Sequence, residues 1–74
     1  MLKKGSQVQW ANSHQISTGE IIEIHDRRIE ITRNGVQITR MGKPSNRVLL
    51  IQQLNAQMVV KLENEVSLLQ TQAI

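Results

Sequence analysis

The chain contains no cysteine, phenylalanine or tyrosine, and it has a single tryptophan, Trp10, and a single proline, Pro44. The absence of cysteine excludes disulfide bonds, thiolate metal sites and a cysteine nucleophile. With one aromatic residue, any core must be built mainly from Ile, Val, Leu and Met side chains. A methyl-lysine cage needs several aromatic walls, so the sequence also argues against that kind of site.

The chain has no long hydrophobic run. The longest, Val48 to Ile51, is far shorter than the roughly 20 residues that cross a bilayer. After Lys3 and Lys4, polar residues interrupt the apolar run that a signal peptide would require. We therefore expect a cytoplasmic protein that does not associate with membranes.

The 74 residues are enough for one domain, which we expect to span residues 1–74, with a core over about 4–66 and a tail over 67–74. A chain of this size buries only about 60% of the surface that its unfolded form exposes. A deep substrate cleft within a packed core is therefore not expected.

Apolar and polar residues alternate with a period of two through the first two-thirds of the chain, which indicates strands that are buried on one face. Val8 and Trp10 begin this pattern, a polar loop is expected over 11–18, and Ile22 and Ile24 continue it. We expect Ile21 to lie at an edge. Asp26-Arg27 predicts a turn that pairs the strand around 21–25 with one around 29–32.

Asn34-Gly35 predicts a second turn, since both residues tolerate positive φ. The triplet Ile-Thr-Arg occurs on each side of it, at 31–33 and 38–40, which we interpret as the two arms of a hairpin. Residues 41–46 hold Pro44 and predict an exposed loop.

Two further elements are expected near the end of the chain. Residues 47–53 and 58–60 are rich in aliphatic side chains and should form another hairpin. After Lys61 the spacing of Leu62, Val66 and Leu69 is helical, which predicts a short C-terminal helix. The core is expected to contain alternating residues of all the strands: Val8, Trp10, Ile22, Ile24, Ile29, Ile31, Ile38, Leu50, Val60 and Leu62.

The pattern predicts an all-β fold, a small SH3-like or Tudor-like barrel of about five antiparallel strands with a short C-terminal helix. Four motifs add a resemblance: Lys4-Gly5-x-x-Val8-x-Trp10, Gly19-x-Ile21-x-Glu23-Ile24, Ile38-Thr39-Arg40-x-Gly42-x-Pro44-x-Asn46 and Val60-Lys61-Leu62-x-x-Glu65-Val66. Together they resemble the hypervirulence-associated Tudor-domain family of small bacterial and fungal proteins. The resemblance implies a Tudor-like barrel and leaves the molecular function open.

Basic residues are concentrated in one segment, although the net charge is only +3. Between 27 and 47 a single acid, Glu30, stands among six basic residues, which form the candidate binding surface: Arg27, Arg28, Arg33, Arg40, Lys43 and Arg47. Such a surface could bind phosphates. The alternative, which we favour, is a solvated face that keeps the protein soluble and protects strand edges.

Other chemistry-bearing residues suggest no catalytic or metal site. His14 and His25 lack further ligands at metal-binding spacing, and Glu20 and Glu23 are better interpreted as solvent-facing than as a paired acid and base. We expect Trp10 to fill the core and not to stack on a ligand. No phosphate-binding loop or nucleophile elbow is present.

We therefore expect no enzyme, no cofactor and no metal. The first hypothesis is a protein-protein interaction module with an unknown protein partner, acting as a monomer or a weak homodimer. The alternative is nucleic-acid binding through the basic segment 27–47. A further partner surface is the aliphatic C-terminal group of Leu62, Val66, Leu68, Leu69 and Ile74.

Overall fold

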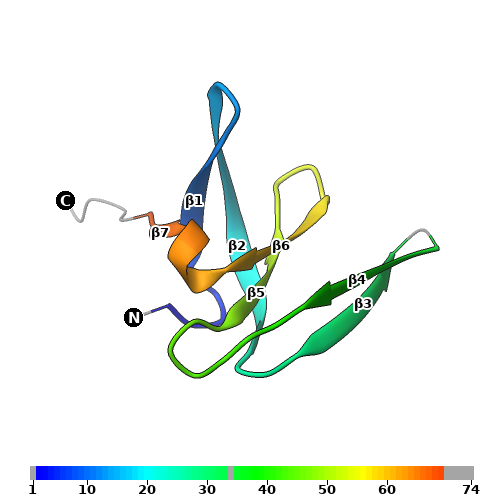
Figure 1. The fold of residues 1–74 in the computed structure, drawn as a ribbon. Coiled ribbons are helices and arrows are strands. Elements are labelled where there is room, and N and C mark those ends of the chain that lie inside the picture. Colours follow the sequence, from blue (N-terminus) through cyan, green and yellow to red (C-terminus); the bar gives the residue numbers. More distant parts are fainter. Residues whose placement is uncertain (1, 34, 70–74) are drawn as a thin grey trace.

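The computed structural model describes residues 2–33 and 35–69, without the side chain of Arg33. This part of the chain is built from strands and a single 3-10 turn, so the expected all-β class is confirmed (Figure 1). The elements are β1 (Gln7–Asn12), β2 (Gln15–His25), β3 (Ile29–Arg33), β4 (Val36–Arg40), β5 (Val48–Gln52), β6 (Met58–Leu62), the turn η1 (Glu63–Glu65) and β7 (Ser67–Leu68).

The strands form two separate sheets. The larger is fully antiparallel in the order β6-β5-β2-β1-β7, and the smaller is the β3-β4 hairpin, which extends away from it (Figure 1). The larger sheet is open, because its outer strands, β6 and β7, do not pair with each other. The closed barrel expected from the sequence is therefore wrong.

The polar segment 11–18 is a tight hairpin instead of the predicted loop. β1 and β2 pair up to Asn12 and Gln15, which leaves only Ser13 and His14 in the turn. Ser13 adopts a φ of 56°, the left-handed conformation that such a short connection requires.

A β-bulge in β2 changes which side chains enter the core. Ile21 pairs with Ile51 and Glu23 pairs with Leu50, so Ile22 is an extra residue on β2. Ile21 is fully buried and Ile22 only half-buried, which corrects the expectation that Ile21 lies at an edge. The predicted pairing of 21–25 with 29–32 is also wrong, because β2 pairs with β5.

The hairpin predicted from the duplicated Ile-Thr-Arg triplet is confirmed. β3 and β4 pair with Ile31 opposite Ile38, and Arg33 opposite Val36. Gly35 has a φ of 77°, as this turn requires, while Asn34 lies outside the described residues. The hairpin formed by residues 47–53 and 58–60 is also confirmed, as β5 and β6.

The C-terminal helix is replaced by a single turn and a strand. η1 spans three residues, and Ser67–Leu68, in the predicted tail, pair with β1 as β7. The Leu69 N–H continues this edge by donating to the Gln7 carbonyl at 2.8 Å. Ile74 lies outside the described residues. Within residues 2–33 and 35–69, no helix is long and apolar enough to span a bilayer.

The core lies almost entirely within the larger sheet. Its main cluster consists of Val8, Trp10, Ile21, Leu49 and Ile51. β5 is buried at four successive positions, Val48 to Ile51, so it is covered on both faces. Of the ten predicted core residues, Val8, Trp10 and Leu50 are buried and the other seven are half-buried.

Candidate binding surfaces

Two loops meet at the base of the β3-β4 hairpin. The Gly42 N–H donates a hydrogen bond to the Arg27 carbonyl at 3.3 Å, which joins the loop after β4 to the turn after β2. A Cβ at Gly42 would lie 2.8 Å from the His25 carbonyl oxygen and 2.9 Å from that of Arg27. Only glycine therefore permits this close approach.

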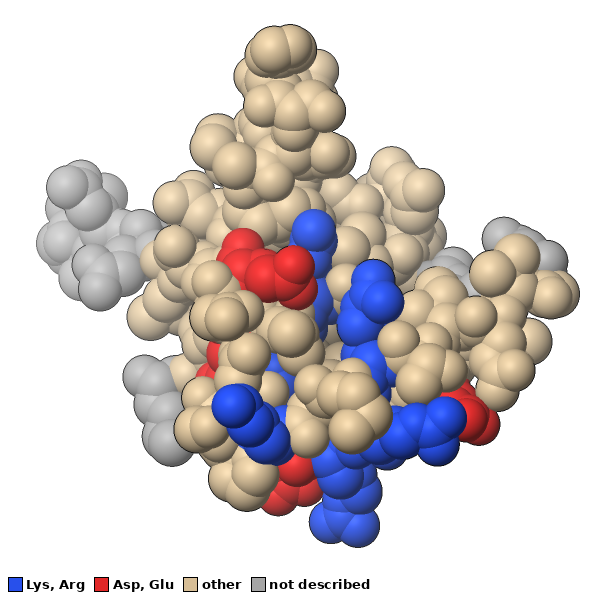
Figure 2. Space-filling model, in the orientation of Figure 1, with Lys and Arg blue, Asp and Glu red and all other residues tan. Residues whose placement is uncertain are grey.

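This junction gathers four of the six predicted basic residues. Ile29 pairs with Arg40 at the base of the hairpin, which places Arg40 beside the turn that carries Arg28. The basic cluster, as we define it, consists of Arg27, Arg28, Arg40 and Lys43, all exposed. In Figure 2, Lys and Arg side chains gather over the lower part of the molecule, where the hairpin joins the larger sheet.

Acidic neighbours neutralise part of the cluster. Arg28 Nη2 lies 2.8 Å from Glu30 Oε1, and Arg27 Nε lies 3.4 Å from Asp26 Oδ1. Both pairs are exposed, so each contributes little to stability. With two acids beside four bases, the cluster keeps a net charge of +2.

Arg47, a predicted member of the binding surface, has a different role. Its Nε and Nη2 donate to the two carboxylate oxygens of Glu63 at 2.8 and 3.0 Å, and Nη2 also donates to the Leu2 carbonyl at 2.9 Å. The side chains of Arg47 and Glu63 are only 22% and 21% exposed. The pair therefore connects the start of β5 to η1 and to the N-terminal segment.

The same contacts shift both ionisation equilibria. Hydrogen bonding from Arg47 lowers the pKa of Glu63 below its ordinary value, and the bond to Glu63 raises the pKa of Arg47. Both shifts favour the charged forms. Arg47 is thus committed to a structural ion pair, while the side chain of Arg33 lies outside the described part.

The other residues considered as metal-binding, catalytic or ligand-stacking groups do not form a common site. His25 Nε2 lies 2.9 Å from Glu23 Oε1, both partly exposed, and His14 is exposed in the β1-β2 turn. Over the described ranges 2–33 and 35–69, no group of three potential metal ligands occurs. Trp10 is 5% exposed, as expected for a core residue.

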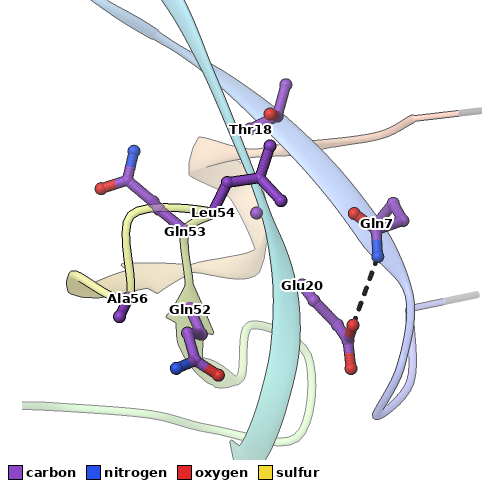
Figure 3. Close-up of a pocket in the computed structure, with 8 residues that line it drawn as sticks. Gln7, Thr18, Glu20, Gln52, Gln53, Leu54 and Ala56 are labelled. Atoms are coloured by element: carbon purple, nitrogen blue, oxygen red, sulfur yellow. Dashed lines mark hydrogen bonds between the residues drawn. The ribbon is translucent and has the colours of Figure 1, made fainter.

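A groove that the sequence did not reveal lies at the other end of β5 (Figure 3). It has a volume of about 330 Å³ and adjoins a second hollow of about 300 Å³. The first is lined by Gln7, Thr18, Gly19, Glu20, Gln52, Gln53, Leu54 and Ala56. The signal available in the sequence was weak: the polar segment from Gln52 to Asn55, with Leu54 within it.

The molecule thus presents two surfaces of different character at opposite ends of β5. The basic cluster lies beside the loop that precedes this strand, and the groove lies beside the turn that follows it. No family model, curated protein or solved structure matches this chain.

Proposed function

We propose that this chain is a non-catalytic interaction module that binds an acidic segment of a partner protein through the basic cluster. The carrying observation is that the Gly42 junction brings exposed bases from two loops and a strand end onto one surface with an excess of positive charge. Guanidinium groups suit carboxylates because they can donate two parallel hydrogen bonds.

The architecture we propose for this module is an SH3-like or Tudor-like fold with its sheet left open. The all-antiparallel larger sheet, the short turn η1 and the return of β7 to β1 support this proposal. We expect a cytoplasmic protein that is a monomer or a weak homodimer.

Nucleic-acid binding through the same cluster is the second candidate, and the cluster's net positive charge favours it. Two features make it the weaker candidate. The only aromatic residue, Trp10, is buried, so it offers no base-stacking platform. The net charge of the cluster, +2, is small for a surface that must hold several phosphates.

A paired set of variants tests the proposal. Arg40→Gln with Lys43→Gln removes the two cluster bases that have no acidic neighbour within ion-pair distance in the described part of the chain. Lys3→Gln with Lys4→Gln removes the same charge from an exposed region outside the cluster. Fluorescence anisotropy would measure binding to a labelled Glu/Ser decapeptide and to generic DNA and RNA.

We expect peptide binding that is lost in the cluster variant and retained in the Lys3/Lys4 variant. Tight DNA or RNA binding that falls steeply with salt would instead support the second candidate. Absence of binding to the peptide, DNA and RNA at low ionic strength would exclude both candidate functions of the basic cluster.

A further inference from the structure

The groove at the end of β5 differs from the basic cluster in its chemistry and in its construction. The groove consists of two adjoining hollows along β2, which share Thr18, Gln53 and Leu54 as lining residues. It follows β2 from Ile16 to Glu20, a length of about 13 Å at roughly 3.3 Å per residue. That length accommodates about four residues of an extended peptide.

One of the lining residues, Gly19, packs closely against β5. A Cβ at Gly19 would lie 2.5 Å from Ile51 Cγ2 and 2.9 Å from the Gln52 carbonyl oxygen. Glycine thus permits the close packing of β2 on β5, in which Gln52 pairs with Glu20. The groove wall is therefore part of the rigid sheet, and the turn that carries Leu54 closes the other side.

Among the described residues, Glu20 is the only charged one that lines the groove, and it has no basic side chain within ion-pair distance there. Four of the other acidic residues lie within ion-pair distance of a basic side chain: Glu23, Asp26, Glu30 and Glu63. Glu65 accepts a hydrogen bond from the Leu62 N–H at 2.7 Å. Glu20 makes, within the described residues, only a long contact of 3.4 Å from Gln7 Nε2 (Figure 3).

The other residues that line the groove suit a peptide better than a nucleic acid. Leu54 is fully exposed and lines the same groove as Glu20, so the groove offers an apolar surface as well as a carboxylate. The amides of Gln7, Gln52 and Gln53 are donors and acceptors that suit a peptide backbone. Among the residues that the structure describes, no basic or aromatic side chain lines either hollow, so the groove has no cation to pair with a phosphate and no ring to stack on a base.

We propose that this groove binds an extended peptide of a partner protein that carries an arginine or lysine, with the cationic head on Glu20 and the aliphatic stem along Leu54. Long basic side chains bury their stems on apolar surface while the charge stays accessible to water. This site goes beyond the proposed function, because it selects the opposite charge and lies at the opposite end of β5.

The test uses two pools of capped heptapeptides with Ser, Thr or Val at all positions except the centre. The centre is arginine in one pool and citrulline, its neutral isostere, in the other. Backbone amide NMR shifts of the ¹⁵N-labelled protein report the binding position. Glu20→Gln removes the groove charge, and Glu23→Gln makes the same change on the same strand outside the groove.

With the arginine pool we expect shifts at Thr18, Gly19, Glu20 and residues 52–56. The citrulline pool and the Glu20→Gln variant should each bind roughly threefold more weakly, the effect expected for an exposed charge pair. Glu23→Gln should bind like the parent. The comparison of arginine with citrulline uses the unaltered protein, so it tests whether the groove selects a cationic side chain even if Glu20→Gln alters the fold.

Equal binding of the two pools, or shifts confined to residues outside the groove, would overturn the proposal. The same groove shifts on concentrating the protein alone would also overturn it, because the cation would then come from a second copy of the chain. Binding of the acidic decapeptide at the basic cluster is measured separately, so the proposal for either site can be disproved without affecting the proposal for the other.

Discussion

The two sheets differ in what they contribute to the molecule. Every fully buried apolar residue of the described part lies in the larger sheet, whereas the apolar residues of the β3-β4 hairpin are half-buried, such as Ile31 and Ile38, or exposed, such as Val36. A two-stranded hairpin is marginally stable by itself. The larger sheet therefore supplies the stability, and the hairpin base supplies the charged surface.

The β3-β4 hairpin, the less stable of the two regions, is attached to the larger sheet at its base. The hairpin joins the larger sheet through the turn after β2 and the loop before β5, which meet at Gly42. The Arg47–Glu63 pair then fixes the end of that loop against η1. Within the described residues β3 and β4 pair only with each other, so changes in the hairpin and in the larger sheet should have very different effects on stability.

The largest effect is expected for Trp10→Ala in the larger sheet. Removing a buried tryptophan typically costs about 3–5 kcal/mol, and a domain of this size has a net stability of only about 3–5 kcal/mol. The variant should be largely unfolded at room temperature when followed by circular dichroism. Cooperative melting within a few degrees of the parent would contradict the core role of the indole.

Gly19→Ala should have the next largest effect. The added methyl group meets Ile51 and the backbone of Gln52, and such overpacking typically costs about 1–3 kcal/mol. Urea denaturation would measure the loss. Gly5→Ala is the control, because its φ of 92° is unfavourable for alanine but its surroundings are open. A smaller loss at Gly19 than at Gly5 would contradict the close crossing of β2 and β5.

Acid should weaken the connection between the loop and η1. The pKa of Glu63 is lowered in the folded state, so its stabilising contribution is complete above the unfolded value and is lost as the pH falls below about 4.3. Charged hydrogen bonds of this kind contribute about 2 kcal/mol. Thermal melts should show the parent approaching Glu63→Gln in stability between pH 5 and pH 3, as approximate limits. A constant difference across this range would contradict the assignment.

Local signals made some elements predictable from the sequence and left others hidden. The β3-β4 hairpin was predictable because Asn34-Gly35 and the repeated triplet are adjacent in the chain. The extra residue Ile22 was not, because a bulge shifts the alternation without any distinctive residue type. The pairings of β2 with β5 and of β1 with β7 are long-range, so no local pattern specifies them.

The candidate binding surfaces also differ in whether a local sequence signal or a long-range contact determines them. The basic cluster was predictable as a concentration of charge along the chain. The role of Arg47 was not, because its partner Glu63 is 16 residues away. The groove depends on three strands, β1, β2 and β5, and a turn brought together by folding, and its lining has no characteristic motif.

The smallest effect is expected for Val36→Thr in the hairpin. Val36 is 61% exposed, so replacing one methyl group by a hydroxyl should change the global stability by less than about 0.5 kcal/mol. Native-state hydrogen exchange sharpens the comparison, because regions with few buried contacts open locally at low free energy. Amides of β3 and β4 should exchange faster than those of β5, and Val36→Thr should accelerate only the hairpin. Equal protection of β4 and β5 would show that the two sheets unfold as one unit.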